Sequence, residues 1–349
     1  MNEIPTPGAF GRIHPVREDW LSLAEPEDIL EPDLPIIDTH HHLWDRPGRH
    51  YLLPDLLADL NSGHNIVATV YAECGSMYRN DGPQAMHAVG EIEFVAGIAQ
   101  QCERDADVHT RVAAGMTGFV DLTAGDSIKP ALEAMIEVGG GRFRGVRHSG
   151  NWHADSIIGN SHHGGGAAGL YLRNDYRRGL STLSALGLSL DAWVYFTQLE
   201  ELVDLARAQP EASLIVNHIC GPLGYGPYTG KADEVFSIWK AGMRELARCP
   251  NVDVKLGGMM MRLATYDYHH AERPITSQQL AELWGPWLTT TIELFGAHRC
   301  TFESNFPVDK MGIGYAELWN AFKRIAAECS PDEKHNLFSG TARRAYRLD

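Results

Sequence analysis

The stretch IIDTHHHLWD, residues 36–45, decides the fold. It begins as an apolar run of strand-forming residues and continues into three consecutive histidines. Because alternate side chains of a strand share a face, His40 and His42 point the same way, with Asp38 one layer deeper, whereas His41 faces away. Two imidazoles at the end of a buried strand can bind a metal ion or polarise a carbonyl group. The stretch therefore predicts a first strand that leads into an active site.

Short apolar runs of this kind alternate with longer helical patterns along the chain. Such alternation indicates a buried parallel sheet, and eight strands are the number that closes a barrel. An open doubly wound sheet is the alternative, but no Gly-x-Gly-x-x-Gly follows the first run. We therefore predict an α/β protein, a (β/α)8 TIM-type barrel. The predicted strands are Ile36–His40, Ile66–Glu73, Gly118–Leu122, Phe143–His148, Leu188–Phe196, Leu214–Ile219, Val252–Leu256 and Cys300–Asn305.

The domain organisation is predicted to be simple. Residues 1–34, rich in proline and acidic residues, are expected to form an N-terminal extension packed on the barrel, with Trp20 and Leu21 as anchors. A disordered tail is the alternative for this segment. Residues 35–349 are expected to form one barrel domain that ends in a terminal helix, because no linker or repeat divides them.

Composition limits the partners. The chain has 45 acidic and 30 basic residues and a formal net charge of −15, which argues against nucleic acid and anionic membranes as partners. The six cysteines are scattered without a Cys-x-x-Cys pair, and no signal peptide or membrane span is evident. We expect a cytoplasmic metabolic enzyme that acts on a small molecule, and homo-oligomerisation is left open.

Polar side chains follow the ends of most other predicted strands. Catalytic residues of a barrel come from the ends of several strands, so these side chains are expected to meet in one site. They are Glu73 after the second strand, Arg147 and His148 after the fourth, Tyr195 after the fifth, Asn217 and His218 after the sixth, Lys255 after the seventh, and Glu303 and Asn305 after the eighth.

The ordered motifs DTHHHLWD, FRGVRH, VNHICGP, VKLGG, FESNFPVDK and NLFSGTARRAYRLD together resemble the amidohydrolase-2 family of the amidohydrolase superfamily. The similarity covers residues 34–349 and is greatest to the group of L-fuconolactonases and 2-pyrone-4,6-dicarboxylate lactonase. It implies a lactonase-like hydrolase of a small cyclic ester, or of a related carboxylated or aromatic metabolite, whose carbonyl is polarised by barrel histidines. His40 and His42 match the family's His-x-His, and His218 matches its strand-six histidine. Arg147 matches an arginine that binds a substrate carboxylate, which suits its planar guanidinium.

Asn305 departs from the family pattern, because it stands where the family carries an aspartate that takes a proton from water. A neutral amide cannot act as a general base. Glu303 shares the face of Asn305 and is the first candidate for that role, with Glu73 and Asp309 as others. An ordinary buried ion pair of Glu303 with a neighbouring cation is an equally good interpretation.

The predicted fifth strand lacks the histidine that metal-dependent members of the family carry. His40, His42 and His218 would suffice for one zinc ion with an open fourth position. The lactonase-like group also includes members thought to work without metal, through hydrogen bonds from histidines. We therefore expect no obligatory cofactor and keep one divalent ion, Zn²⁺, at these three histidines as the alternative.

Further residues are predicted to contact the substrate, and other functions stay open. Tyr195 and Tyr225 are plausible walls for a ring, Arg262 is a candidate second anion contact, and Glu73 lies at a strand end. A decarboxylase, dehydratase or isomerase on the same barrel is one alternative function, because it need not activate water. A catalytically silent binding protein is another.

Overall fold

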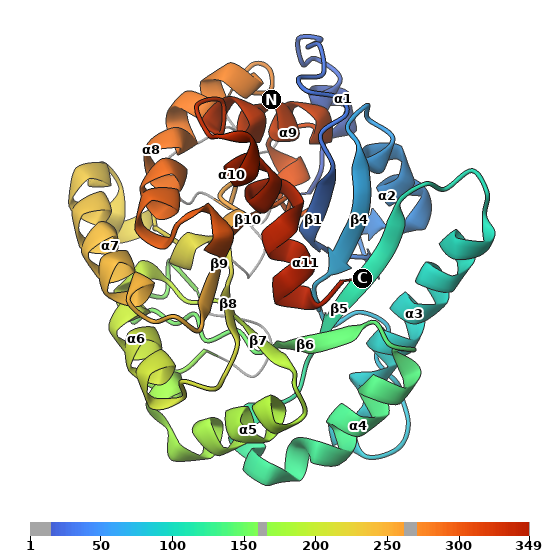
Figure 1. The fold of residues 1–349 in the computed structure, drawn as a ribbon, viewed down its shortest axis with the longest axis vertical. Helices are drawn as coiled ribbons and strands as arrows, with labels where there is room; N and C mark the ends of the chain where they lie inside the picture. Colours follow the sequence, from blue (N-terminus) through green and yellow to red (C-terminus); the bar gives the residue numbers. More distant parts are fainter. Residues whose placement is uncertain (1–14, 160–165, 262–270, 349) are drawn as a thin grey trace.

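The structure is a computed structural model that describes residues 15–159, 166–261 and 271–348 (Figure 1). Its main sheet has eight strands, each parallel to its neighbours, in the order of the chain. The first and last strands of the sheet close on each other through two backbone hydrogen bonds just beyond their ends. The His42 amide donates to the Phe306 carbonyl, and the Asn305 amide donates to the His40 carbonyl, both at 2.8 Å. The predicted (β/α)8 barrel is confirmed. The strands are β1 (Ile36–His41), β4 (Ile66–Tyr71), β5 (Arg111–Gly118), β6 (Phe143–Arg147), β7 (Ser189–Ala192), β8 (Leu214–Val216), β9 (Val252–Gly257) and β10 (Cys300–Glu303).

The longer helices surround the sheet because they have an apolar stripe to bury. In α8, Leu280, Trp284 and Leu288 recur every four residues and are all buried, and Thr276 caps the helix by accepting from the Gln279 amide. The α-helices are α1 (Glu18–Leu21), α2 (Leu53–Leu60), α3 (Val89–Arg104), α4 (Lys129–Val138), α5 (Asn174–Ala185), α6 (Leu199–Ala208), α7 (Ala232–Ala247), α8 (Ser277–Phe295), α9 (Tyr315–Ile325), α10 (Pro331–His335) and α11 (Thr341–Tyr346). None of them, within the described ranges, is long and apolar enough to cross a membrane.

The third barrel strand is the one that the sequence misplaced. It was predicted at Gly118–Leu122, but β5 covers Arg111–Gly118. The strand is buried from Val112 onward although it is made largely of Ala, Gly, Thr and Met, so it lacks the bulky β-branched signal of its neighbours. The predicted run instead leaves the sheet, because Asp121 accepts from the Thr123 amide and starts the 3₁₀ helix η2 (Leu122–Ile128).

The amino ends of the strands are closed by the C-terminal helix α11, which crosses the barrel opening in Figure 1. Ala342, Ala345, Tyr346 and Leu348 form one buried apolar cluster with residues of four strands. A site for ligands must therefore open at the other end, where the strands have their carboxyl ends. The strand residues of this cluster are Ile37, Ala68, Val70, Ala114 and Ile215.

The described part of the N-terminal segment is tied to the barrel by specific contacts. Trp20 is buried, and its indole N–H donates to the Ala271 carbonyl at 3.1 Å. Further along, the Lys323 ammonium on α9 donates to the carbonyls of Leu30 and Glu31 at 2.6 and 2.9 Å. These contacts hold the described part of the segment in place, and its division from a barrel domain at residue 34 stays a prediction.

Candidate active site

Three histidines meet at the carboxyl end of the barrel. His40 and His42 lie on the inward face of β1 and its extension, and their Nε2 atoms are 3.2 Å apart. His218 follows β8, and its ring centre lies 4.7 Å from that of His40. All three side chains are buried. His41, as expected from strand alternation, faces the other way and contacts the Thr69 hydroxyl through Nε2 at 2.9 Å.

Hydrogen bonds at Nδ1 determine which ring nitrogens carry protons. His42 Nδ1 lies 2.8 Å from the Ala72 carbonyl, which can only accept, so Nδ1 is protonated and Nε2 carries a lone pair. His218 Nδ1 lies 2.7 Å from Oε1 of Glu303, and the same oxygen accepts from the His218 amide at 2.9 Å. Nε2 of His218 is buried and has no hydrogen-bond partner among the described residues. Both rings thus direct an unprotonated nitrogen away from their supports.

His40 has two neighbours at Nδ1 that make opposite demands. Glu303 Oε2 lies 2.8 Å away in ion-pair contact, and the Lys255 ammonium lies 3.3 Å away. Lys255 has shorter contacts at 2.8 Å to the Thr39 carbonyl and to the Asp191 carboxylate, so we assign the Nδ1 proton to the side of Glu303. Nε2 of His40 lies 3.2 Å from the lone pair of His42 Nε2, so these two nitrogens must either share one proton or bind a common cation.

Electrostatics keep the three imidazoles neutral. Burial lowers the pKa of His40, and the charge of Lys255 lowers it further. Burial also lowers the pKa of His42 and of His218, although Glu303 partly opposes the effect at His218. Burial alone would raise the pKa of Glu303, but the electrostatic attraction and hydrogen bonds of His218, together with the charge of Lys255, outweigh it and lower that pKa. The result is an anionic carboxylate among neutral imidazoles.

This donor set fits a divalent metal ion. Two nitrogen ligands on a tetrahedral zinc ion are about 3.3 Å apart for Zn–N bonds of about 2.0–2.1 Å, close to the observed His40–His42 separation. His40, His218 and Glu303 also offer ligand atoms within 4.8 Å of one another. Hydrogen bonds from ligand imidazoles to a carboxylate or a carbonyl are the usual support of such ligands. The structure therefore places Glu303 beside the expected set of His40, His42 and His218, in contact with two of the three rings.

The backbone around the site is strained, which is common where side chains must converge. His218 and Asn305 have φ values of 54° and 55°, in the left-handed region that favours glycine. Gly258, which follows β9, also has a positive φ of 66°, and a Cβ there would lie 1.8 Å from Nδ1 of His218. Gly258 is thus required for His218 to occupy its position.

Asp191 on β7 is a buried hub that sequence reasoning missed. Its carboxylate pairs with the Lys255 ammonium at 2.8 Å and accepts from Asn217 Nδ2 at 3.0 Å. The Tyr346 hydroxyl of α11 donates to it from the closed end of the barrel at 2.9 Å. A carboxylate inside the otherwise apolar run LSLDAWVYF was the available signal, since buried charges are almost always paired.

Arg147 and Glu73 form the second polar group of the site. Arg147 NH1 donates to the Glu73 carbonyl at 3.0 Å and contacts its carboxylate at 3.4 Å, while Nε donates to Asn217 Oδ1 at 3.1 Å. Burial raises the pKa of Glu73 to about 7, against the opposing charges of Arg147 and Arg46. Through Asn217 and Asp191 this group is joined to Lys255 and hence to His40.

The remaining predicted residues lie in varied positions. Asn305 is buried, and its Nδ2 donates to Oδ1 of Asp309 at 2.9 Å, so its amide oxygen is the end left for another partner. Burial raises the pKa of Asp309 well above its usual value. The hydroxyls of Tyr195 and Tyr225 donate to the carbonyls of Gly159 and Ile158, at 3.3 and 2.8 Å. Both tyrosines therefore hold the loop after β6. Arg262 lies outside the described residues.

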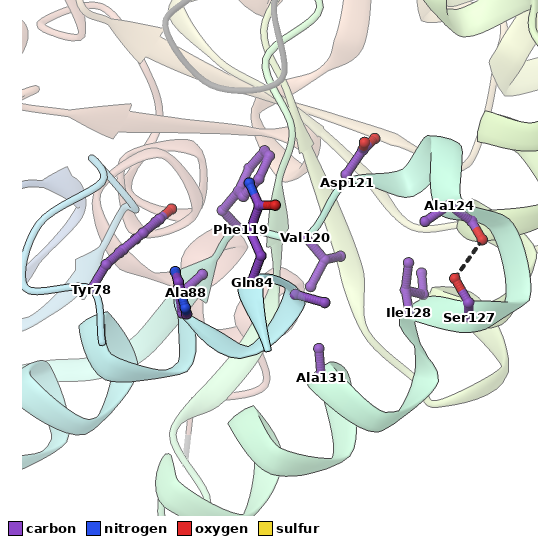
Figure 2. Close-up of a pocket in the computed structure, with 12 residues that line it drawn as sticks. Tyr78, Gln84, Ala88, Phe119, Val120, Asp121, Ala124, Ser127, Ile128 and Ala131 are labelled. Carbon is purple, nitrogen blue, oxygen red and sulfur yellow. Dashed lines mark hydrogen bonds between the residues drawn. The ribbon is translucent and has the colours of Figure 1, made fainter. Parts of the chain in front are cut away.

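A separate cavity of about 530 Å³ lies between the 3₁₀ helix η1 (Gln84–Met86) and η2 (Figure 2). Tyr78, Phe119 and Asp121 are among its lining residues, and none of the clustered histidines is. Its polar groups have local partners: Asp121 accepts from the Thr123 amide, and Ser127 Oγ donates to the Ala124 carbonyl at 2.8 Å. The cavity is therefore not the place where the histidines act.

A barrel whose strand ends gather three imidazoles, a carboxylate and an arginine is the architecture of a barrel hydrolase of the amidohydrolase type. Residues 37–348 match the family model described as Amidohydrolase (Amidohydro_2), so the chain belongs to this family. It is 30% identical to the uncharacterized protein y4mH of Sinorhizobium fredii, over 90% of this chain and 99% of that protein.

Two further comparisons bear on the site. The chain is 25% identical to an L-fucono-1,5-lactonase of Burkholderia multivorans, over 89% of this chain and 96% of that enzyme. The crystal structure of a Burkholderia multivorans amidohydrolase with bound zinc superposes with a TM-score of 0.67 at 23% identity, covering 90% of this chain and 99% of that one. The solved structure supports the fold, while substrate and metal are properties of those proteins.

Proposed function

We propose that this enzyme hydrolyses a lactone, or a similar cyclic ester, of a small carboxylated molecule, with a divalent metal ion at the histidine cluster. The observation that carries the proposal is the set of three buried imidazoles, each with an oxygen beside its Nδ1 atom, next to an arginine. Such a set is suited to acting on a carbonyl group next to an anchored carboxylate. The lactonase relative supports the reaction type.

The residues that would hold the metal are His40, His42 and His218, through Nε2. A bound zinc ion supplies Lewis acidity toward a carbonyl oxygen and lowers the pKa of a bound water. Glu303 is a positioning residue in this proposal, because both its oxygens face Nδ1 atoms of His40 and His218. It keeps these two rings in the tautomer that presents Nε2.

The other side chains handle the substrate and the proton. Arg147 is held at Nε and NH1 and would bind the substrate carboxylate with its remaining N–H groups. Glu73, with a pKa of about 7, is suited to accept a proton from water and return it to the leaving alkoxide. Asn305 would orient water or substrate through its amide oxygen, since it cannot take the proton itself.

The proposal is tested with the purified protein and a panel of lactones of sugar acids and aromatic acids. We expect about one equivalent of zinc per chain, loss of turnover on chelation, and recovery on adding zinc back. Hydrolysis in ¹⁸O-labelled water should place one solvent oxygen in the product. Full activity after complete metal removal would contradict the metal part, and a product without solvent oxygen would exclude hydrolysis.

A non-hydrolytic reaction such as decarboxylation is the second candidate, and Asn305 is the observation that favours it. A neutral amide stands at position 305, where the family pattern has a carboxylate. The Asn305 Nδ2 donates to Asp309. Such a site can still polarise a carbonyl but is less suited to deprotonating water. Carbon dioxide release from a carboxylated aromatic probe, without uptake of ¹⁸O, would establish this alternative. A protein that binds these probes but turns none over would be a binding protein.

A further inference from the structure

A small hairpin after β1 concentrates positive charge at the mouth of the barrel. Strands β2 (Trp44–Arg46) and β3 (Arg49–Tyr51) are antiparallel, and Arg46 is the direct partner of Arg49. Like charges directly opposite each other destabilise a β ribbon. Burial and the charge of Arg46 both lower the pKa of Arg49. In a chain with a net charge of −15, such a pair is a local exception to the overall charge.

Arg46 is connected to the histidine cluster by a stack of side chains. Its guanidinium carbon lies 5.2 Å from the ring centre of Trp44. The buried Trp44 ring stacks on His42, with ring centres 5.5 Å apart and planes inclined by only 16°. Stacking of this kind orients a guanidinium while leaving its edge free for hydrogen bonds. Trp44 is thus the one side chain between the Arg46 guanidinium and the His42 imidazole in this stack.

A second contact brings Arg46 near the arginine of the proposed site. Arg46 donates through NH2 to the Cys74 carbonyl, and Arg147 donates through NH1 to the preceding carbonyl, that of Glu73. Two guanidinium groups therefore converge on consecutive carbonyls after β4. Within the described residues, the Cys74 carbonyl is the one hydrogen-bond acceptor of Arg46, and its side chain is partly exposed. A guanidinium has five N–H donors, so most of them remain for a ligand.

We propose that Arg46, with Arg49 beside it, binds a second anionic group of the substrate, a carboxylate or a phosphate, while Arg147 binds the first carboxylate. The inference rests on the proposed function, because it extends the same site toward the hairpin. It identifies the substrate class as a cyclic ester with two negatively charged groups. The other interpretation, in which Arg46 only balances the charge of Glu73, predicts no difference between ligands with one and two charges.

The test is direct binding of two five-carbon acids, valerate with one carboxylate and glutarate with two, measured by calorimetry on the zinc-loaded protein. We expect glutarate to bind about tenfold more tightly than valerate, the effect of one charge-assisted contact. The variant Arg46→Met should lose most of this preference while binding valerate nearly as before. The preference should narrow as the salt concentration rises, because the contact is partly exposed.

Matched controls separate this inference from the proposed function. Arg104→Met removes the same charge from an exposed residue at the end of α3 and should change neither affinity. Equal binding of glutarate and valerate by the unmodified protein, or a preference that survives Arg46→Met, would overturn the second anion position. Failure of Arg147→Met to weaken either acid would instead contradict the carboxylate contact of the proposed function.

Two further arms complete the experiment. Inorganic phosphate that competes with glutarate in the unmodified protein, but not in Arg46→Met, would assign the position to phosphate as well as carboxylate. Absence of that competition would restrict it to carboxylates. If Arg46→Met melts at a clearly lower temperature, Arg46→Lys provides the same comparison, since it keeps the charge but not the planar fork. An unchanged glutarate preference in Arg46→Lys and a lost one in Arg46→Met would still support an electrostatic contact.

Discussion

The two ends of the barrel are built from the same eight strands but carry opposite chemistry. At the carboxyl ends, buried histidines, carboxylates and Arg147 are joined by polar contacts on a strained backbone. At the amino ends, small and branched apolar residues pack beneath α11. Buried charges and left-handed residues cost stability, whereas apolar burial provides it. The arrangement at the open end thus favours chemistry and lowers stability. The apolar packing at the closed end provides the compensating stability.

The largest expected effect comes from removing one imidazole at the open end. His218→Ala should lower kcat/KM by about a thousandfold or more and reduce the zinc content, because it deletes a proposed metal ligand. The free energy of unfolding should fall by about 1–3 kcal/mol, because Glu303 loses a hydrogen-bond partner, and a urea titration would show it. His41→Ala is the control on the opposite face of β1: it should cost about 1–3 kcal/mol of stability and leave turnover within a few-fold. Equal losses of turnover in both variants would show that the outward face of β1 matters for catalysis as much as the open end of the barrel does.

A substitution at the closed end should have the reverse pattern. Ile215→Ala truncates a fully buried side chain of the cluster beneath α11 and should reduce the free energy of unfolding by about 2–5 kcal/mol. The kcat/KM of the folded variant should stay within about twofold of the unmodified enzyme. Ile136→Ala, at an exposed position of α4, should change stability by less than about 0.5 kcal/mol. A large loss of kcat/KM in Ile215→Ala would show that the two ends are not separable.

A smaller effect is expected from the carboxylate that supports the imidazoles. Glu303→Gln keeps the shape but cannot accept from Nδ1 of both His40 and His218, so zinc affinity should fall about 10- to 100-fold. Competition with a chelator of known affinity measures the change. Asp253→Asn is the matched control, because it breaks an ion pair with Arg344 at the closed end. If both variants bind zinc as tightly as the unmodified protein, Glu303 does not support the metal ligands.

The smallest expected effect is a dependence of stability on pH that also belongs to the open end. Burial raises the pKa of Glu73 and of Glu91 to about 7, above the usual value of about 4.3 for glutamate in an unfolded chain. Each group therefore contributes stability that is fully present below about pH 4.3 and is lost as the pH rises through about 7.

Urea titrations between pH 6 and pH 8 should accordingly show a decrease of about 1 kcal/mol per group as the pH rises. Glu91→Gln retains an oxygen for the three hydrogen bonds that Glu91 Oε1 now accepts, from Tyr71, Cys74 and Ser76. Its stability should depend less steeply on pH over this range. A curve as steep as that of the unmodified protein would show that Glu91 is not one of the titrating groups.

Much of the fold and part of the site follow from strand periodicity. A period of two places His40 and His42 on one face and His41 on the other, and the carboxyl ends of parallel strands bring Arg147 and His218 toward them. The third strand was misplaced because Ala and Gly carry little strand signal, even when they are buried.

The partners of the charged residues could not be predicted in the same way. Glu303 was expected either to act as a base or to pair with a cation, but it contacts two imidazoles, one of which lies 85 positions away in the chain. Lys255 pairs with Asp191 on another strand. Such choices depend on the distances between side chains across the barrel interior, which no local pattern records. The hairpin that carries Trp44 and Arg46 was likewise not predicted, since its strands have three residues each.

The contact between Tyr346 and Asp191 has a consequence for the order in which the protein is made. A ribosome releases the N-terminal strands first, at about 5–20 residues per second, and α11 leaves the exit tunnel after every strand has been synthesised. Until then Asp191 lacks the hydroxyl that approaches it from below, and the apolar starts of the strands are uncovered. The nascent barrel therefore has every histidine of its site in the chain before α11 can cover the closed end, and we expect the proposed binding of zinc to begin only after α11 has been synthesised.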